Sequence, residues 1–155
     1  MLWSSKRATD ALINCTLQVS RESVTLRYMS KVKAPASAKR SLCPISSTLD
    51  IIGDKWTLLI LRDMLFMQKR QFGDFLKSPE KIATNILTNR LSKLTEIGLI
   101  EKHAYQNNPP RYEYHLTQAG RSLKPVLFEI MQWGIENVDS VYKPKAETLA
   151  RVKSA

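Results

Sequence analysis

Apolar residues recur at helical spacing where the ordered part of the chain is expected to begin. Leu49, Ile52 and Trp56 lie three and four positions apart, which predicts a helix. Ser46 or Ser47 supplies a side chain of the type that caps a helix N-terminus. The Gly-Asp pair that precedes Trp56 marks a break or a junction.

Two further helices are predicted before residue 80. Residues 55–66 are apolar nearly all round, so this helix must be buried centrally. A third helix begins at Phe72, uses Phe75 and Leu76 as its apolar side, and ends at the following Ser-Pro.

Residues 83–97 predict an amphipathic helix that Gly98 terminates. Leu87, Leu91 and Leu94 fall at i, i+4 and i+7 and form its buried stripe. The opposite face carries Asn, Thr, Ser and Lys side chains. Residues 99–105 and 111–116 then predict two strands, joined by a loop over 106–110 into a hairpin.

Thr117 is a suitable N-cap for a last helix that reaches about Val138, and Pro125 should bend it or mark a junction between two helical pieces. The apolar residues of this segment form two stripes, and a helix that covers one core needs only one stripe. We therefore predict dimerisation with a second copy of the chain. The predicted dimerisation residues are Leu127, Phe128, Met131 and Ile135.

The chain has 155 residues, of which 43% are hydrophobic, enough for one domain with a real core. We predict a disordered basic tail over 1–41, a folded domain over 42–139 and a basic C-terminal tail over 140–155. The stretch that starts at Met29 looks like the natural start of a bacterial regulator, so Met29 is an alternative start to Met1.

The sequence predicts a cytoplasmic protein without a membrane partner. It has neither a long apolar run for a membrane span nor the features of a secretory signal. Two cysteines, Cys15 and Cys43, cannot form a disulfide framework.

The formal net charge is +10, and its distribution favours a nucleic-acid partner. Much of the excess lies near the two ends of the chain, where charge commonly serves only solvation. Within the middle of the chain, basic residues outnumber acidic ones between 69 and 111, the segment that holds the polar-faced helix and the hairpin.

Three helices followed by a hairpin are the element order of a winged helix, mostly α with a small β-hairpin wing. Its third helix enters the major groove of double-stranded DNA, where Asn and Thr side chains read base edges and Arg and Lys hold phosphates. A DNA-bound protein of this kind would associate with the nucleoid. The predicted DNA-binding residues are Thr84, Asn85, Thr88, Asn89, Arg90, Lys93 and Arg111.

Several motifs in one order resemble the HxlR-type winged-helix regulators of bacteria. The motifs are "CPISSTLDIIGDKWTLLILRDML", "FGDFLKSPEKIATNILTNRLSKLTEIGLI", "PPRYEYHLTQAGRSLKPVL" and "WG", over about residues 43–136. The resemblance implies a homodimeric DNA-binding transcriptional regulator with a C-terminal dimerisation helix, whose operator has two half-sites. This chain departs from the family at Lys81, where relatives often have glycine before Ile82.

Some members of that family sense oxidants or electrophiles through a cysteine that matches Cys43. A helix start beside Cys43 and the nearby Lys39 and Arg40 would favour its thiolate. The alternative is a small, half-buried packing residue under the dimer helix.

A catalytic function has little support, and no cofactor is expected. The two histidines, His103 and His115, lie on the predicted strands without a metal-ligand spacing, so no metal is predicted. The sequence contains no glycine-rich phosphate loop and no nucleophile elbow. A winged helix that binds proteins without binding DNA remains the alternative function.

Overall fold

The computed structural model describes residue 32 and residues 43–154. Val32 is half-buried and packs against the core. The rest of the predicted disordered tail over 1–41, including Cys15 and the alternative start at Met29, lies outside these described residues. Along the described part the helices and strands are, in order, α2 (Pro44–Ile52), α3 (Lys55–Phe66), α4 (Phe72–Leu76), α5 (Thr84–Glu96), β1 (Ile100–Asn107), β2 (Pro110–Leu116), α6 (Gln118–Arg121), α7 (Lys124–Asn137) and α8 (Ala146–Ser154).

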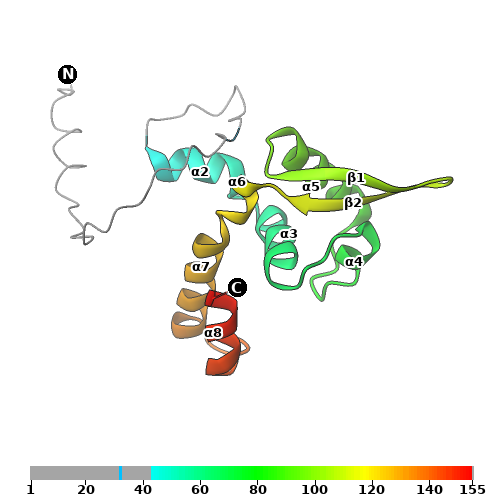
Figure 1. Ribbon diagram of the computed structural model, residues 1–155. Helices are drawn as coiled ribbons and strands as arrows, with labels where there is room; N and C mark the ends of the chain where they lie inside the picture. Colours follow the sequence, from blue (N-terminus) through cyan, green and yellow to red (C-terminus); the bar gives the residue numbers. More distant parts are fainter. Residues whose placement is uncertain (1–31, 33–42, 155) are drawn as a thin grey trace, which may run out of the picture.

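The predicted class, mostly helical with a small hairpin wing, is confirmed. Strands β1 and β2 pair antiparallel, and the hairpin extends away from the helices (Figure 1). A bridge between Gln71 and Glu113 adds a short third piece of strand beside β2. Helix α5 packs against α3 and β1, which is the arrangement of a winged helix.

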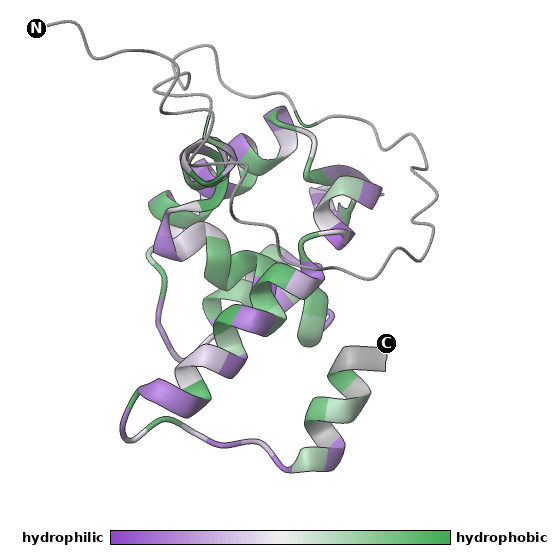
Figure 2. Ribbon diagram, turned by 90° about the vertical axis from the view of Figure 1, so that its left-hand side faces the viewer, coloured by the Kyte–Doolittle hydropathy of each residue, from purple (hydrophilic) through white to green (hydrophobic). Residues whose placement is uncertain are grey.

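The core lies where α3, α5 and the base of the hairpin meet. Leu61, Leu87 and Leu91 have at most 1% of their surface exposed, and Leu99 and Ile100 at the start of β1 are equally buried. Figure 2 shows the hydrophobic ribbon gathered at this centre, with hydrophilic positions on the outside. Burial of these side chains provides the main force that holds α5 on the domain.

Helix α2 begins earlier than the sequence predicted. Cys43 is its N-cap and Pro44 occupies its first turn, so Ser46 and Ser47 lie inside the helix and do not cap it. Proline is favoured in the first turn because its fixed φ suits a helix and its missing N–H is not needed there.

The segment after the hairpin contains the predicted junction. Thr117 caps α6 by accepting a hydrogen bond from the backbone N–H of Gly120, and Pro125 lies in the first turn of the separate helix α7. A side chain at Gly120 would place its Cβ 2.2 Å from the carbonyl oxygen of Leu99. Only glycine therefore lets α6 approach the start of β1 this closely.

Within the predicted basic C-terminal tail, residues 146–154 form helix α8. Leu149 and Ala150 of α8 line a groove of about 300 Å³ together with Phe128 and Ile135 of α7.

Candidate nucleic-acid interface

The polar face of α5 is presented outward because its apolar face is fixed in the core. Leu87, Leu91 and Leu94 are 0 to 1% exposed. Thr84, Asn85, Thr88 and Asn89 lie on the other side, in the first two turns, and all four are exposed. The helix ends before Gly98, whose φ of +79° is the left-handed conformation that glycine adopts most readily.

The two asparagines are the best placed to read bases. Among the described residues, neither the Asn85 nor the Asn89 side chain has a hydrogen-bond partner. Each amide therefore keeps its donors and its acceptor for a base edge. Thr88 instead donates its hydroxyl to the carbonyl oxygen of Thr84 at 2.9 Å, so Thr88 offers an acceptor and a methyl group.

Arg90, one of the predicted DNA-binding residues, is half-buried and already has a partner within the chain. Its Nη2 donates to Oδ2 of Asp54 at 3.1 Å, and its Nε lies 3.1 Å from Oδ1 of the same carboxylate. Asp54 also caps α3 by accepting from the backbone N–H groups of Trp56 and Thr57. Arg90 therefore ties α5 to the start of α3, and we assign it to the protein's own structure rather than to DNA.

Two other predicted cations lie on different elements. Lys93 is half-buried on α5, and Arg111 is exposed on β2 next to the turn of the hairpin. Neither has an ion pair within the described residues. On the same hairpin, Nζ of Lys102 lies 3.8 Å from the ring centroid of Tyr112.

Sequence reasoning missed Lys55. A shallow groove of about 460 Å³ runs beside the N-terminal half of α5. Lys55 and Trp56 of α3 line this groove together with Asn85 and Asn89. A lysine in the first turn of the helix that precedes the recognition motif is the only signal that could have identified it.

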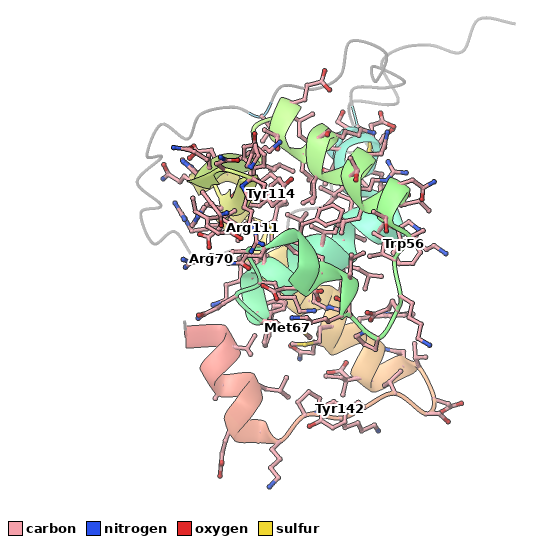
Figure 3. All side chains as sticks on the ribbon, turned by 90° about the vertical axis from the view of Figure 1, so that its right-hand side faces the viewer. Trp56, Met67, Arg70, Arg111, Tyr114 and Tyr142 are labelled. Atoms are coloured by element: carbon pink, nitrogen blue, oxygen red, sulfur yellow. The ribbon has the colours of Figure 1, made fainter. Side chains whose placement is uncertain are left out.

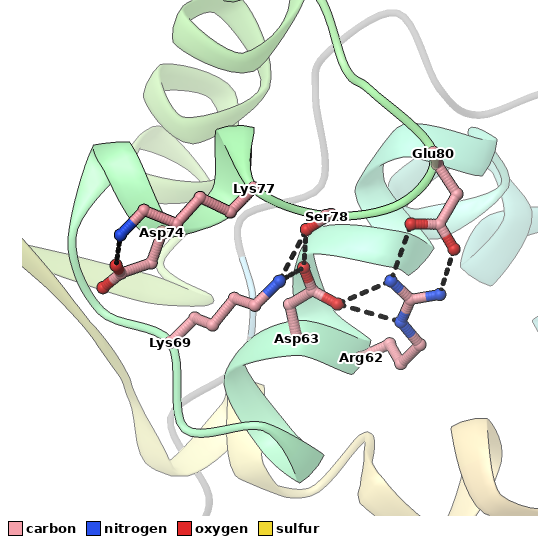
Figure 4. A network of polar contacts seen from close by, with 7 residues as sticks. All are labelled: Arg62, Asp63, Lys69, Asp74, Lys77, Ser78 and Glu80. Atoms are coloured by element: carbon pink, nitrogen blue, oxygen red, sulfur yellow. Dashed lines mark hydrogen bonds and ion pairs between the residues drawn. The ribbon is translucent and has the colours of Figure 1, made fainter.

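The connector that leads into α5 is fixed by a polar network (Figure 4). The buried carboxylate of Asp63 accepts from Arg62 at 2.6 Å, from Lys69 at 2.8 Å and from the hydroxyl of Ser78. Arg62 also donates to Glu80 at 2.5 and 3.1 Å. The network thus joins the end of α3 to residues 78–80, immediately before the recognition helix.

This network changes the acidity of its members. The hydrogen bond from Arg62 holds the pKa of Glu80 below its usual range, against a smaller opposing effect of burial. The hydrogen bond to Glu80 in turn raises the pKa of Arg62. Both groups are therefore charged at neutral pH, and the ion pair persists there.

The connector also contains Lys81, a position at which the resemblance noted in the sequence implies glycine. Lys81 has a φ of +52°, in the left-handed region that glycine adopts without strain. Its backbone N–H donates to the carbonyl oxygen of Ser78 at 3.0 Å, which closes the turn. A glycine at this position would adopt the turn without strain, whereas the lysine adopts it at a cost.

The predicted dimerisation residues do not share one surface. Leu127 is 6% exposed and packs into the core of its own chain, so this residue was assigned wrongly. Phe128 and Ile135 face α8, and Met131 is half-buried. The most exposed apolar residues of α7 are instead Ile130, at 51%, and Trp133, at 63%.

Cys43 is half-buried at the N-terminus of α2. The described residues contain no group of three or more His, Cys, Asp or Glu side chains arranged to hold a metal ion. The two histidines contact each other across the hairpin, with ring centroids 5.2 Å apart. No helix of the described chain combines the length and the apolar character that crossing a bilayer requires.

Sequence comparison identifies relatives of one kind. The family model for the HxlR-like helix-turn-helix matches residues 51–142. The HTH-type transcriptional regulator YdeP of Bacillus subtilis is 39% identical over 111 residues, which cover 72% of this chain and 86% of YdeP. The HTH-type transcriptional regulator sll1512 of Synechocystis is 39% identical over 93 residues, 60% of this chain and 68% of that protein.

Two solved structures of one redox regulator are also similar to this chain. The redox regulator HypR in its reduced form superposes with a TM-score of 0.57 at 32% identity, over 63% of this chain and 95% of HypR. Its oxidised form gives a TM-score of 0.56 at 33% identity, over 63% of this chain and 99% of HypR.

Proposed function

The chain belongs to the HxlR-like helix-turn-helix family, and we propose that it is a transcriptional regulator that binds double-stranded DNA sequence-specifically as a homodimer. A dimer with twofold symmetry presents two copies of α5, so its operator contains two related half-sites. The function requires no cofactor and no catalytic step.

The exposed face at the start of α5 carries the proposal. Asn85 and Asn89 lie one helical turn apart, exposed and without partners among the described residues. Asparagine amides at this spacing suit the donor and acceptor pairs on adenine in the major groove. Thr84 and Thr88 beside them offer hydroxyl and methyl groups to neighbouring bases.

Phosphate contacts come from the cations around this face. Lys93 on α5, Arg111 on the hairpin and Lys55 on α3 have no carboxylate partner within the described residues. The N-terminus of α5 adds backbone donors, because its N-cap, Ala83, has no side chain that could satisfy them. Such contacts set affinity and orientation rather than sequence preference.

The test is binding to duplex DNA at several salt concentrations. Operator fragments recovered from a genome-wide footprint of the tagged protein supply the specific DNA, and a shuffled duplex supplies the control. The affinity should fall steeply with salt, with a log–log slope of about 0.9 per phosphate neutralised. A winged helix that serves only protein binding would show no duplex binding at any salt concentration, and that result would refute the function.

We also infer a response to oxidants or electrophiles through Cys43. Two observations support it: the thiol lies at the N-terminus of α2, and the chain is similar in sequence and structure to the redox regulator HypR. Modification of Cys43 would alter the packing of α2 and thereby the spacing of the two recognition helices. The protein would act in the cytoplasm, bound to the nucleoid.

The variant Cys43→Ser distinguishes a sensing role of Cys43 from a packing role. The variant should bind the operator as well as the wild type under reducing conditions, and it should lose any release by diamide, as measured by fluorescence anisotropy of labelled operator. Cys15→Ser is the matched control and should respond like the wild type. Operator binding by the wild type that diamide leaves unchanged would make Cys43 a packing residue.

A further inference from the structure

A cavity lies on the domain where α3, the hairpin and the last helices meet. It measures about 430 Å³, within the range of small-molecule sites. Its lining comes from the end of α3, the connector to α4, strand β2, α6 and the first residue of α7. None of the residues proposed to contact DNA lines it. We call it the junction cavity.

The floor of the junction cavity is apolar. Met64, at 6% exposure, and Tyr114, at 9%, belong to the hydrophobic core and also face the cavity. Leu65 and Leu116, both half-buried, complete this surface. A ligand with an apolar body would exclude water chiefly from Leu65 and Leu116, which are still partly exposed, and gain binding free energy from doing so.

The rim is cationic and lacks acidic residues. Arg70, Arg121 and Lys124 line it, and no Asp or Glu does. Within the described residues none of the three has an ion pair. Lys69 differs, because Asp63 and Ser78 already bind its ammonium group. Arg70 and Tyr114 are labelled beside the hairpin in Figure 3, and the backbone N–H of Tyr114 donates to the carbonyl oxygen of Arg70 at 2.9 Å.

The start of α7 adds to the positive potential. The helix begins at Lys124, and its N-cap, Leu123, makes no side-chain capping bond. Pro125, in the first turn, has no N–H to offer, so the contribution of α7 is the positive end of its helix dipole beside the cationic rim. On these grounds we propose that the junction cavity binds a small organic anion, a monocarboxylate with an aromatic or branched aliphatic body.

A DNA phosphate fits these observations less well. Phosphate would satisfy the three cations, but it would leave the apolar floor formed by Met64, Leu65 and Leu116 uncovered. A carboxylate on an apolar body satisfies both parts of the cavity. The shape and the charge thus favour a small amphiphilic anion.

The position of the cavity would allow a bound anion to affect DNA binding. One wall is β2, a strand of the wing, and another is the junction between α6 and α7. A bound anion bridges these elements and stabilises one orientation of the wing relative to α7. If the orientations differ in DNA affinity, anion and DNA affect each other's binding by the same factor.

Calorimetry on the full-length protein without DNA tests the proposal, so failure of the proposed DNA-binding function would not affect the result. The probes are benzoate, phenylacetate and isovalerate, with benzamide as the neutral isostere of benzoate and inorganic phosphate as the anion without an apolar body. At least one carboxylate should bind saturably, and benzamide and phosphate should bind at least about tenfold more weakly, because each lacks one of the two interactions.

Substitutions that each remove one positive charge test whether the carboxylate binds in the junction cavity. Arg121→Gln and Lys124→Gln should each weaken carboxylate binding by about tenfold or more, as expected for the loss of a charge-assisted hydrogen bond. Lys143→Gln, an equal change of charge outside the cavity, should leave it unchanged, and thermal unfolding checks that all variants fold. Absence of saturable binding for all three carboxylates, equal binding of phosphate, or equal effects of the three variants would each overturn the proposal.

Discussion

At the scale of single residues, the side chains of α5 differ in what they already contact. Arg90 uses its guanidinium on Asp54, whereas Asn85 and Asn89 have no partner within the described residues. The same helix thus separates a structural role from a recognition role. A side chain that already has hydrogen bonds within the protein would have to break them to contact DNA. A side chain without such hydrogen bonds can contact DNA at no such cost.

Removing either asparagine amide should therefore reduce specificity rather than general affinity. Asn85→Ala and Asn89→Ala should each cost about 1 to 3 kcal/mol on the operator and little on shuffled duplex DNA. Arg111→Ala is the comparison and should weaken binding to both duplexes, because a phosphate contact is independent of sequence. Fluorescence anisotropy on the two duplexes measures the difference. Equal losses on both DNAs for the asparagine variants would contradict the assignment.

A second residue-scale prediction concerns the turn before α5. Lys81 holds a φ of +52°, which costs an L-residue about 1 to 2 kcal/mol relative to its preferred regions. Lys81→Gly should remove this strain and raise the free energy of unfolding by up to about 1 kcal/mol, since the greater freedom of glycine in the unfolded chain offsets part of the gain. Urea unfolding, monitored by circular dichroism, measures this change in the free energy of unfolding.

The matched control is Lys77→Gly, which removes the same charge four residues earlier. Lys77 has a φ of −80° and a ψ of −2°, a conformation in which glycine offers no relief. This variant should lower the stability or leave it unchanged. Equal shifts for the two variants would mean that the strain at Lys81 is absorbed elsewhere.

At the scale of elements, the recognition helix depends on what holds its connector. The segment between α4 and α5 has no regular structure apart from its turns, and the network of Arg62, Asp63, Ser78 and Glu80 attaches it to α3. Asp63 is 2% exposed, so its charge is tolerated only because three donors surround it. The polar network thus orients the entry of α5 in a way that hydrophobic packing alone would not specify.

The pH dependence of stability should report on this attachment. Arg62 depresses the pKa of Glu80, so the pair stabilises the fold fully above the usual carboxyl range, and the stabilisation is lost as the pH falls through the lowered pKa. Glu80→Gln should therefore be less stable than the wild type at pH 7, and the difference should shrink as the solution is acidified. Denaturant unfolding at a series of pH values measures this. Glu96→Gln, at an exposed glutamate without an ion pair in the described chain, should show a smaller, pH-independent change.

The sequence predicted best those elements whose apolar pattern repeats within the element itself. The leucine stripe of α5 and the alternation in β2 identified these elements within a few residues of their bounds. Helix α8 was missed: Leu149 and Ala150 line a groove with Phe128 and Ile135 of α7, a neighbourhood that the local sequence does not reveal. The Arg90–Asp54 pair was missed for the same reason, since 36 positions separate its members.

At the scale of the whole molecule, several large apolar side chains of the described residues are exposed on two helices. Ile130 and Trp133 on α7 are 51% and 63% exposed, and Ile45 and Leu49 on α2 are 71% and 55% exposed. Monomeric proteins rarely expose several large apolar side chains on neighbouring helical turns. A second copy that covers both helices would bury them and would also set the distance between the two recognition helices.

The dimer can be tested by placing a charge on this surface. Ile130→Asp and Trp133→Asp would each bury an unpaired carboxylate in the proposed interface, which is costly, while both sites are exposed enough that the folded monomer tolerates the change. Sedimentation should then show monomers, with operator binding weakened because one recognition helix reaches only one half-site. Met67→Asp is the matched control, since Met67 is 53% exposed at the end of α3 and belongs to neither α2 nor α7. Met67→Asp should sediment like the wild type. If the two α7 variants also do so, the apolar face of α7 serves another purpose than self-association.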